Sequence, residues 1–238
     1  MLYLSALIEL CEVSRVYNPG SGEVRALDGV SLRVEAGEFI SVVGPSGSGK
    51  STMMNLIGCL DMPTCGRYLL EGSEITALTD DALSEIRGRK IGFIFQGFNL
   101  IPGMTAMENV ELPLLYRGIG REKRRKMALE ALWQVDLPGR THHRPNQMSG
   151  GQQQRVAIAR AIASKPPIIL ADEPTGNLDS ASGGEIMRIL HELSGMGKTV
   201  ILITHDDGVA ANTDRTVRIQ DGRVVADSRG GGGRKRGR

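Results

Sequence analysis

The chain of 238 residues is 40% hydrophobic and 24% charged, a balance that suits one globular domain with a sizeable core. Its apolar runs are shorter than the roughly 18 residues that cross a bilayer, and its apolar start lacks the basic leader of a secretory signal. The formal net charge is +2, but five positive charges fall in the last ten residues. The rest of the chain is therefore acidic by about three charges, and no nucleic-acid partner is expected.

The first apolar segments indicate antiparallel strands. Residues 8–13 predict one strand, and Val24–Val34 is typical of a hairpin that turns near Asp28 and Gly29. Tyr17 follows the first strand, and its ring suits either stacking on an adenine base or ordinary half-burial at a strand end. Residue type alone does not separate these two interpretations. A small antiparallel β-subdomain is therefore expected beside a parallel α/β core.

A phosphate loop is the strongest local signal. Residues 44–51 match G-x-x-x-x-G-K-[ST] at every fixed position and follow the apolar run Phe39–Val43, which predicts a strand, a loop and a helix. Backbone N–H groups and the helix dipole would bind nucleotide phosphates, so an accidental glycine-rich turn is disfavoured. Lys50 would reach the β- and γ-phosphates, Ser51 would ligate Mg²⁺, and we expect Lys50 to face solvent. The predicted nucleotide contacts are Gly44, Pro45, Ser46, Gly47, Ser48, Gly49, Lys50, Ser51 and Thr52.

Helical patterns dominate the middle of the chain. The short buried strand Ile91–Phe95 ends in Gln96, and a capping box then begins a helix that Pro113 is expected to end or kink. Residues 121–135 carry apolar side chains at helical spacing beside a basic run, which is typical of an amphipathic helix. These elements predict a helical subdomain at about residues 97–163.

Polar residues follow three further segments. Ser149 precedes two glycines at a helix start, which suits either an ordinary cap or a second anion site. Asp172 and Glu173 stand at the end of the apolar strand Ile168–Asp172. In a protein with a phosphate loop, Asp172 suits a Mg²⁺-linked role and Glu173 suits a general base for water. The alternative is that these acids are ordinary turn residues at a strand end. His205 follows another buried strand, at the edge where parallel sheets bind ligands.

The predicted fold class is α/β: a P-loop NTPase core with a mostly parallel sheet, an antiparallel β-subdomain and a helical insertion. The domain is expected to span residues 1–228. Residues 229–238 combine five glycines with five basic residues, and since they bury nothing they are predicted to be a disordered tail.

In this order, the motifs resemble the nucleotide-binding subunit of ABC transporters, over roughly residues 7 to 227. The resemblance implies an adenine platform at Tyr17, a coupling and Mg²⁺-sensing Gln96, and a γ-phosphate contact at His205. It implies Glu173, His205 and Gln96 as catalytic residues, and Ser51, Gln96 and Asp172 as metal ligands. The signature motif would supply Ser149, Gly151 and Gln152 to the nucleotide, and the D-loop would supply Asp179.

Longer segments resemble the branch of macrolide and peptide exporters and lipoprotein-releasing ATPases. They are residues 57–61, 95–102 and 171–179. Met148 departs from the usual leucine but is similar in volume, and Asn177 is similar to this branch. The resemblance implies an ATP hydrolase that depends on Mg²⁺ and drives export or membrane extraction through a separate transmembrane permease.

The expected location is the cytoplasm, on the inner face of the membrane through the permease; three cysteines without metal spacing agree with reduced thiols. One phosphate loop with two anion sites predicts an ATP-dependent, head-to-tail homodimer. A P-loop kinase or GTPase would not need the second anion site, and a DNA-repair ABC ATPase would need a longer insertion before Ser149. A cell-division ABC ATPase that regulates a membrane partner without transport remains the alternative.

Overall fold

A computed structural model describes residues 6–18, 20 and 22–230 and divides into two compact units. The first combines Met1–Ala77 with Leu202–Arg238, and the second is Leu78–Ile201. Within the described residues, no helix is both long and apolar enough to span a membrane.

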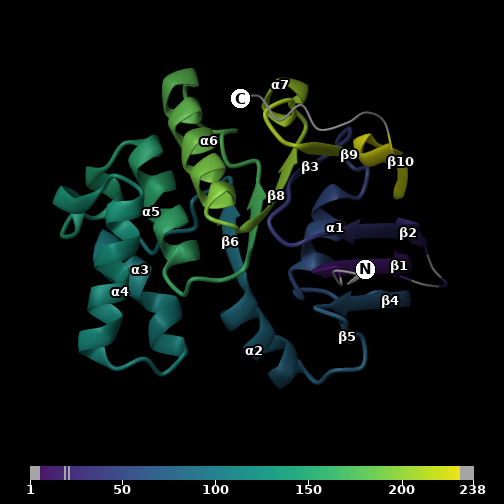
Figure 1. Cartoon of the computed structure of the whole chain (residues 1–238), viewed down its shortest axis with the longest axis horizontal. Coiled ribbons are helices and arrows are strands. Elements are labelled where there is room, and N and C mark those ends of the chain that lie inside the picture. The colour runs from purple at the N-terminus through teal and green to yellow at the C-terminus, as the bar shows by residue number, and fades with distance from the viewer. Residues whose placement is uncertain (1–5, 19, 21, 231–238) are drawn as a thin grey trace, which may run out of the picture. The chain divides into compact units, whose positions relative to one another are not determined.

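The first unit contains an antiparallel sheet in the order β2-β1-β4-β5, as predicted for the β-subdomain. Strands β1, β2 and β4 lie side by side in Figure 1. Alternate side chains of β1, among them Ile8 and Leu10, are buried, which explains why the strand has one apolar face. The strands are β1 (Ile8–Tyr17), β2 (Val24–Val34), β4 (Cys65–Leu70) and β5 (Ser73–Glu74).

The predicted hairpin turn at Asp28 and Gly29 is wrong, because Val24–Val34 is one continuous strand. Leu27 pairs with Arg15 and Val30 pairs with Val13, so Asp28 and Gly29 together oppose one residue of β1. This is a β-bulge, and Gly29 takes the positive φ of 64° within it. Bulges and tight turns use the same residue types, so local sequence could not separate them.

The first unit also holds the strands that carry the phosphate loop. Their order is β10-β9-β3-β8, with β3 parallel to β9, and β9 and β10 form an antiparallel hairpin. All five residues of β3 are buried. The elements are β3 (Phe39–Val43), α1 (Lys50–Ile57), β8 (Thr199–Thr204, which enters from the second unit), α7 (Asp207–Ala210), β9 (Arg215–Gln220), β10 (Arg223–Asp227) and the 3₁₀ turn η3 (Ser228–Gly230).

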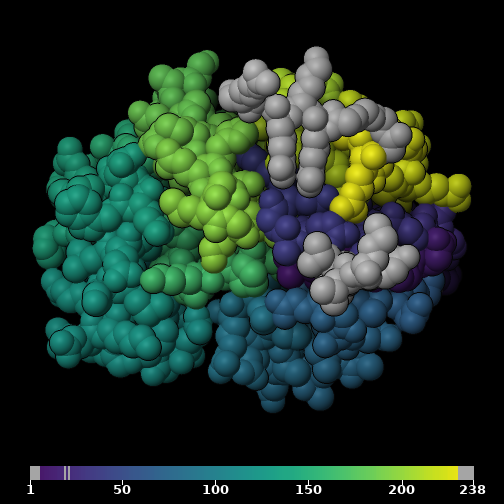
Figure 2. All heavy atoms as spheres, viewed as in Figure 1, coloured from purple at the N-terminus to yellow at the C-terminus, as the bar shows by residue number. Residues whose placement is uncertain are grey.

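The second unit places helices around two parallel strands, β6 and β7. Helix α3 packs on α4 and α5, and these helices fall within the region predicted as a helical insertion (Figure 1). In the space-filling view the teal side chains of α3 and α4 form one continuous body (Figure 2). The elements are α2 (Asp80–Lys90), β6 (Ile91–Phe95), α3 (Ala106–Tyr116), α4 (Arg121–Gln134), η1 (Pro138–Arg140), η2 (Pro145–Gln147), α5 (Gly150–Ile162), β7 (Ile168–Asp172) and α6 (Ser180–Gly195).

Helix α3 begins as predicted but does not end at Pro113. Thr105 and Glu108 form the expected capping box. Pro113 lies inside the helix, which continues to Tyr116 and ends where the Arg117 N–H bonds to the carbonyls of Leu115 and Pro113. Proline removes only one helical hydrogen bond, and packing of α3 on α4 and α5 supports the remaining turn.

The segment after β10 includes the first residues of the predicted tail. Arg229 lies in η3, where its backbone N–H bonds to Asp227 Oδ1 at 3.1 Å and its Nη2 lies 2.8 Å from Glu38 Oε1. The boundary expected after residue 228 therefore falls inside this short element. Residues 231–238, which make up most of the predicted disordered tail, lie outside the described residues.

A buried arginine on β9 binds an aspartate on β10. Arg215 is 6% exposed, and its Nε and Nη2 donate to the two carboxylate oxygens of Asp227 at 2.8 and 2.6 Å. Its Nη1 donates to Glu38 Oε2 at 3.0 Å and to the Arg33 carbonyl at 2.8 Å. Such a forked pair is strong because both partners are charged and aligned. The hydrogen bond from Arg215 holds the pKa of Asp227 below its ordinary value of 3.8.

We expect Asp227→Asn to lower the free energy of unfolding at pH 7 by about 1–3 kcal/mol, because the buried guanidinium loses the carboxylate that it binds in a fork and keeps only Glu38 as a charged partner. A lowered carboxyl pKa stabilises the fold above the unfolded pKa of about 3.9, and this stabilisation disappears as pH falls through the folded value. Urea unfolding at pH 7 and at stepwise lower pH should therefore show the two proteins converging below about pH 4. Asp136→Asn is the control, because Asp136 pairs with Arg188 on the surface. If Asp227→Asn and Asp136→Asn lowered the free energy of unfolding equally, the ion pair between Asp227 and the buried Arg215 would not be specially stabilising.

Candidate active site

The phosphate loop holds Lys50 in a way that the sequence did not predict. Lys50 does not face solvent: it is 9% exposed, and its Nζ donates to the carbonyl oxygens of Gly44 and Pro45, each at 2.8 Å. The ammonium is buried because the loop itself offers these two acceptors. Lys50 therefore stabilises the loop conformation as well as providing a positive charge inside it.

Two glycines of the loop are required by close backbone contacts. A Cβ at Gly44 would lie 2.1 Å from the carbonyl oxygen of Ile219 on β9. Gly49 has a φ of 104°, and a Cβ there would lie 2.4 Å from the carbonyl oxygen of Ala26 on β2. The Gly222 N–H, in the turn between β9 and β10, donates to the Ser48 carbonyl at 3.0 Å. The surrounding strands thus determine the shape of the loop.

The start of α1 has the properties of an anion site. Gly49 is the N-cap and offers no side chain to the first N–H groups of the helix, whose first turn has no acidic residue. Ser48 Oγ is buried and has no hydrogen-bond partner within the described part of the chain. Pro45, Ser46, Gly47 and Ser51 are exposed. A phosphate group would supply the acceptors that these donors lack.

Tyr17 and His205 belong to the same unit as the loop. Tyr17 is half-buried at the end of β1, and its hydroxyl donates to Asp61 Oδ2 at 2.8 Å. His205 is exposed directly after the buried strand β8, as the sequence predicted, and Asp206 then caps α7. The second unit contains all the other predicted site residues.

Gln96 is connected to the segment that follows β7. Its Nε2 donates to Asn177 Oδ1 at 3.2 Å, and Asn177 Nδ2 donates to the Gln96 carbonyl at 3.1 Å. A Cβ at Gly176 would lie 2.7 Å from Gln96 Nε2, so this glycine permits the approach. From its sequence context alone, Asn177 is only a feature shared with one branch of the family. The structure shows it as the partner of Gln96.

The two predicted acids lie at the end of β7. Asp172 is the last strand residue, and Glu173 follows with a φ of 45°, a conformation that is uncommon for residues other than glycine. The next carbonyl, of Pro174, accepts a hydrogen bond at 2.8 Å from Nε2 of the fully buried Gln154 on α5. Such strained backbone at a strand end often accompanies function. Sequence reasoning missed Gln154, because a run of glutamines on a helix normally indicates an exposed face.

The predicted signature segment forms the N-terminus of α5. Ser149 Oγ accepts from the Gln152 N–H at 3.3 Å, and Gln152 Oε1 accepts from the Ser149 N–H at 3.1 Å, which is a capping box. A Cβ at Gly151 would lie 2.8 Å from Ser182 Oγ on α6, so glycine is needed for close helix packing. Ser149 is thus a helix cap, and the predicted anion site at this helix start stays a prediction.

Asp179 caps α6 and shares Ser182 with this packing. Its Oδ1 accepts from the Ser182 N–H and its Oδ2 from Ser182 Oγ, both at 2.9 Å. These hydrogen bonds lower the pKa of Asp179. Ser182 therefore links the D-loop residue to the signature helix, a role that its sequence position alone did not indicate.

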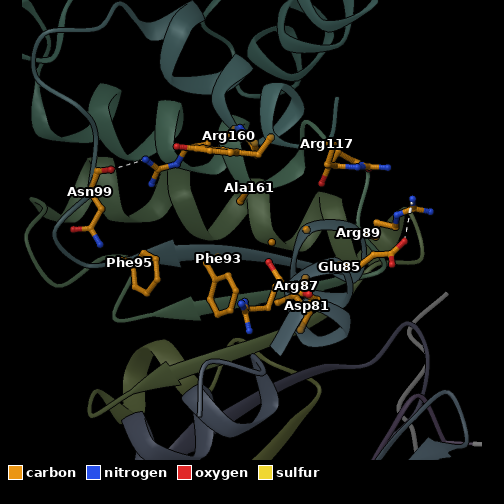
Figure 3. A pocket seen from close by; sticks show the side chains of 17 residues that line it. Asp81, Glu85, Arg87, Arg89, Phe93, Phe95, Asn99, Arg117, Arg160 and Ala161 are labelled. Carbon is orange, nitrogen blue, oxygen red and sulfur yellow. Dashed lines mark hydrogen bonds and ion pairs between the residues drawn. The ribbon is translucent and has the colours of Figure 1, made fainter. Parts of the chain in front are cut away.

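A cavity of about 890 Å³ lies within the second unit, between α2, β6, α3 and α5 (Figure 3). Phe93 and Phe95 stack along one side of it with ring centroids 5.7 Å apart. Arg160 reaches across from α5 and donates to the carbonyls of Phe98, at 2.9 Å, and Asn99. Burial lowers the pKa of the Arg160 guanidinium. The basic residues of the lining are Arg87, Arg89, Arg117 and Arg160.

The loop between β6 and α3 is held at both ends. Phe98 and Asn99 both have positive φ, and Arg160 binds their carbonyls. Asn109, fully buried on α3, accepts from the Ile101 N–H at 2.8 Å and donates to the Thr105 carbonyl at 3.0 Å. Neither Arg160 nor Asn109 was predicted from the sequence, although an asparagine in an apolar helix can indicate a buried side chain with several hydrogen bonds.

The fold and these motifs define an α/β phosphate-loop NTPase. Residues 27–176 match the family model described as ABC transporter, and the chain belongs to this family. It is an ABC-type ATPase cassette.

Similar proteins of known sequence and structure are also ABC ATP-binding proteins. The chain is 53% identical over 222 residues to the macrolide export ATP-binding/permease protein MacB of Hyphomonas neptunium, covering 93% of this chain and 34% of that protein. It is 50% identical over 228 residues to an uncharacterized ABC transporter ATP-binding protein of Thermotoga maritima, covering 96% and 97%. A solved dimeric structure of the ATP-binding cassette MJ0796, in a post-hydrolysis state with ADP and Pi, is 51% identical with a TM-score of 0.85, covering 92% of this chain and 97% of that one. The chain thus spans about a third of the first of these relatives and nearly all of the other two.

Proposed function

We propose that this chain hydrolyses ATP to drive export or membrane extraction of a substrate through a separate transmembrane permease. The observation that carries this proposal is the phosphate loop, where a buried Lys50 and an uncapped helix start meet. The MacB relative is named an ATP-binding/permease protein, which favours a permease as partner. No described residue favours the cell-division alternative in particular.

The phosphate loop would bind the nucleotide. The α1 N–H groups, Ser48 and Lys50 would hold the β- and γ-phosphates, with Gly44, Pro45, Ser46, Gly47, Gly49 and Thr52 shaping the loop. Ser51, Gln96 and Asp172 would hold Mg²⁺, because the ion prefers oxygen ligands and each of these side chains provides one. When bound, Mg²⁺ neutralises charge on the phosphates. Tyr17 would stack on the adenine base.

Glu173 is proposed as the general base. It would accept a proton from water while the water oxygen bonds to the γ-phosphorus and the bond to the β–γ bridging oxygen breaks, releasing ADP and phosphate. His205 would hydrogen-bond to the γ-phosphate. The unusual backbone of Glu173 supports the assignment, because strain at a strand end persists where a side chain must be aimed.

A head-to-tail homodimer is the proposed active unit. The N-terminus of α5, with Ser149, Gly151 and Gln152, would meet the γ-phosphate of the nucleotide bound by a second copy, and Asp179 would lie in the same interface. The dimeric structure of the MJ0796 cassette with ADP and Pi supports this arrangement. Two-fold symmetry then gives two equivalent composite sites.

The cavity of the second unit is proposed to receive the permease. Its rim carries Tyr116, which is 84% exposed, and the adjoining loop carries Ile101, which is 39% exposed. The four arginines of the lining outnumber its two acidic residues, Asp81 and Glu85. Apolar side chains exposed beside such a cavity suit a partner segment with apolar and acidic residues. Through this contact the chain would reside in the cytoplasm on the inner face of the membrane.

We expect the pair Tyr116→Ser and Ile101→Ser to reduce copurification of the permease by about tenfold, which corresponds to roughly 1.4 kcal/mol of lost binding. Pull-down of coexpressed permease by a tagged chain would measure this. Trp133→Ser is the matched control, because Trp133 is 66% exposed on α4 but does not line the cavity. If the double variant captured as much permease as the unchanged chain, the proposed docking site would be wrong.

Reconstitution tests the proposed function as a whole. The purified chain with its permease in liposomes should release phosphate from Mg-ATP and move substrate across or out of the bilayer. A complex that hydrolyses ATP without moving any substrate would favour the regulatory alternative instead.

A further inference from the structure

Asp61 lies in the turn that ends α1, the helix that begins at the phosphate loop. Helix α1 ends at Ile57, Cys59 takes a positive φ of 54°, and the N–H groups of Leu60 and Asp61 both bond to the Asn55 carbonyl, at 2.8 and 3.2 Å. This turn reverses the chain. The eight residues of α1 span about 12 Å, so Asp61 is tied to the loop by one short rigid element.

The backbone after Asp61 is also tied to β1. The Thr64 N–H donates to the Ser14 carbonyl at 2.8 Å, and Thr64 Oγ1 accepts from the Val16 N–H at 3.0 Å. The turn and the strand are therefore held together on the side of β1 that leads to Tyr17.

The Asp61 carboxylate binds two side chains of β1 at once. Arg15 forms a fork on it, with Nε 2.9 Å from Oδ2 and Nη2 2.8 Å from Oδ1. The Tyr17 hydroxyl donates to Oδ2 at 2.8 Å. The side chains of Arg15 and Asp61 are only 26% and 21% exposed, so water competes weakly with these charge-assisted bonds.

Arg15 also covers one face of the tyrosine ring. Its Cζ lies 4.6 Å from the ring centroid of Tyr17, a cation–π arrangement. The ring is therefore held at its hydroxyl and on one face by groups that Asp61 connects. A base can stack only on the opposite face, and the hydroxyl is already engaged.

We infer that Asp61 is a positioning residue that fixes the Tyr17 ring as the platform for the nucleotide base. This inference rests on the proposed role of Tyr17. A ring already held in place loses little conformational freedom when a base stacks on it, so its affinity for the base is higher than that of a free ring. Asp61 would then act on the base alone, while the phosphates are bound elsewhere, by the loop and α1.

The experiment compares binding of ATP with binding of tripolyphosphate, which lacks the base, by calorimetry on the full chain with Mg²⁺. We expect Asp61→Ala to weaken ATP binding by about 3–10-fold and to leave tripolyphosphate within about twofold. Tyr17→Phe, which keeps the ring but loses the hydroxyl, should resemble Asp61→Ala. Tyr17→Ala should weaken ATP binding by about tenfold or more, as loss of base stacking does.

The double variant Asp61→Ala/Tyr17→Ala should bind ATP no more weakly than Tyr17→Ala, because Asp61 acts through the ring. Asp136→Ala, which removes another arginine-paired aspartate, should bind both ligands normally. If Asp61→Ala weakens the binding of ATP and of tripolyphosphate equally, Asp61 has a general structural role and the inference fails. The inference also fails if the double variant binds ATP more weakly than Tyr17→Ala. If Tyr17→Ala binds ATP like the unchanged protein, the proposed platform itself is wrong, whatever Asp61 does.

Discussion

Replacing Glu173 with Gln should slow ATP turnover by about 10²–10⁴-fold, or roughly 3–5 kcal/mol of barrier. Glutamine keeps the size and hydrogen bonding of the side chain but does not accept the proton of the attacking water. The backbone at this position is unaffected by the change, because both residues meet the same steric limits at a φ of 45°. Phosphate release under saturating Mg-ATP measures the effect.

The same variant should accumulate as an ATP-loaded dimer. If hydrolysis normally separates the two copies, a chain that binds ATP but does not cleave it remains a dimer with ATP in both composite sites. Size-exclusion chromatography with Mg-ATP should then show a dimer, and the same column with ADP should show a monomer. Glu130→Gln is the control, since Glu130 pairs with Lys165 on the surface. A Glu173→Gln monomer under both conditions would contradict the composite site and leave Ser149 as a helix cap.

Lys50→Ala should reduce turnover by at least about 100-fold, because it removes the positive charge that we propose to contact the phosphates. It should also lower the free energy of unfolding by about 1–3 kcal/mol, since the carbonyls of Gly44 and Pro45 lose the donor that they share. Phosphate release from Mg-ATP measures the loss of turnover, urea unfolding measures the loss of stability, and calorimetric titration shows whether nucleotide binding is weakened.

The matched control for Lys50→Ala is Lys198→Ala. Lys198 Nζ also donates to a backbone carbonyl, that of Lys165, at 3.2 Å, but Lys198 is not among the residues proposed to contact the nucleotide or Mg²⁺. Its loss should leave nucleotide binding unchanged. A Lys50→Ala protein that is folded by circular dichroism and binds Mg-ATP at full strength would overturn the assignment of the phosphate loop.

Local signals in the sequence predicted most elements of the fold. The capping boxes at Thr105 and Ser149, and the strands Ile91–Phe95 and Ile168–Asp172, depend on residues within a few positions of each other, so the sequence carries the full information. The expected hairpin in Val24–Val34 failed because a bulge needs its partner strand to be recognised. Glycine is common both in hairpin turns and in β-bulges of this kind.

The contacts that hold the predicted site residues in place could not be predicted from the sequence. Burial of Lys50 depends on the path of its own loop, and the need for glycine at position 151 depends on Ser182, thirty-one residues later. Arg160 binds carbonyls more than sixty residues away, at Phe98 and Asn99. Such contacts join distant parts of the chain, and no periodicity or motif records them.

Helix α5 is anchored at several points along its length, with a consequence for regulation. Gln154 holds the turn after Glu173, and Arg160, six residues or about 9 Å further along the same helix, holds the loop beside the cavity. A partner that shifts this loop would therefore act on a rigid helix that also holds the turn after Glu173. Thermodynamic linkage makes such coupling reciprocal: by whatever factor a bound partner changes nucleotide affinity, the nucleotide must change the affinity for that partner by the same factor.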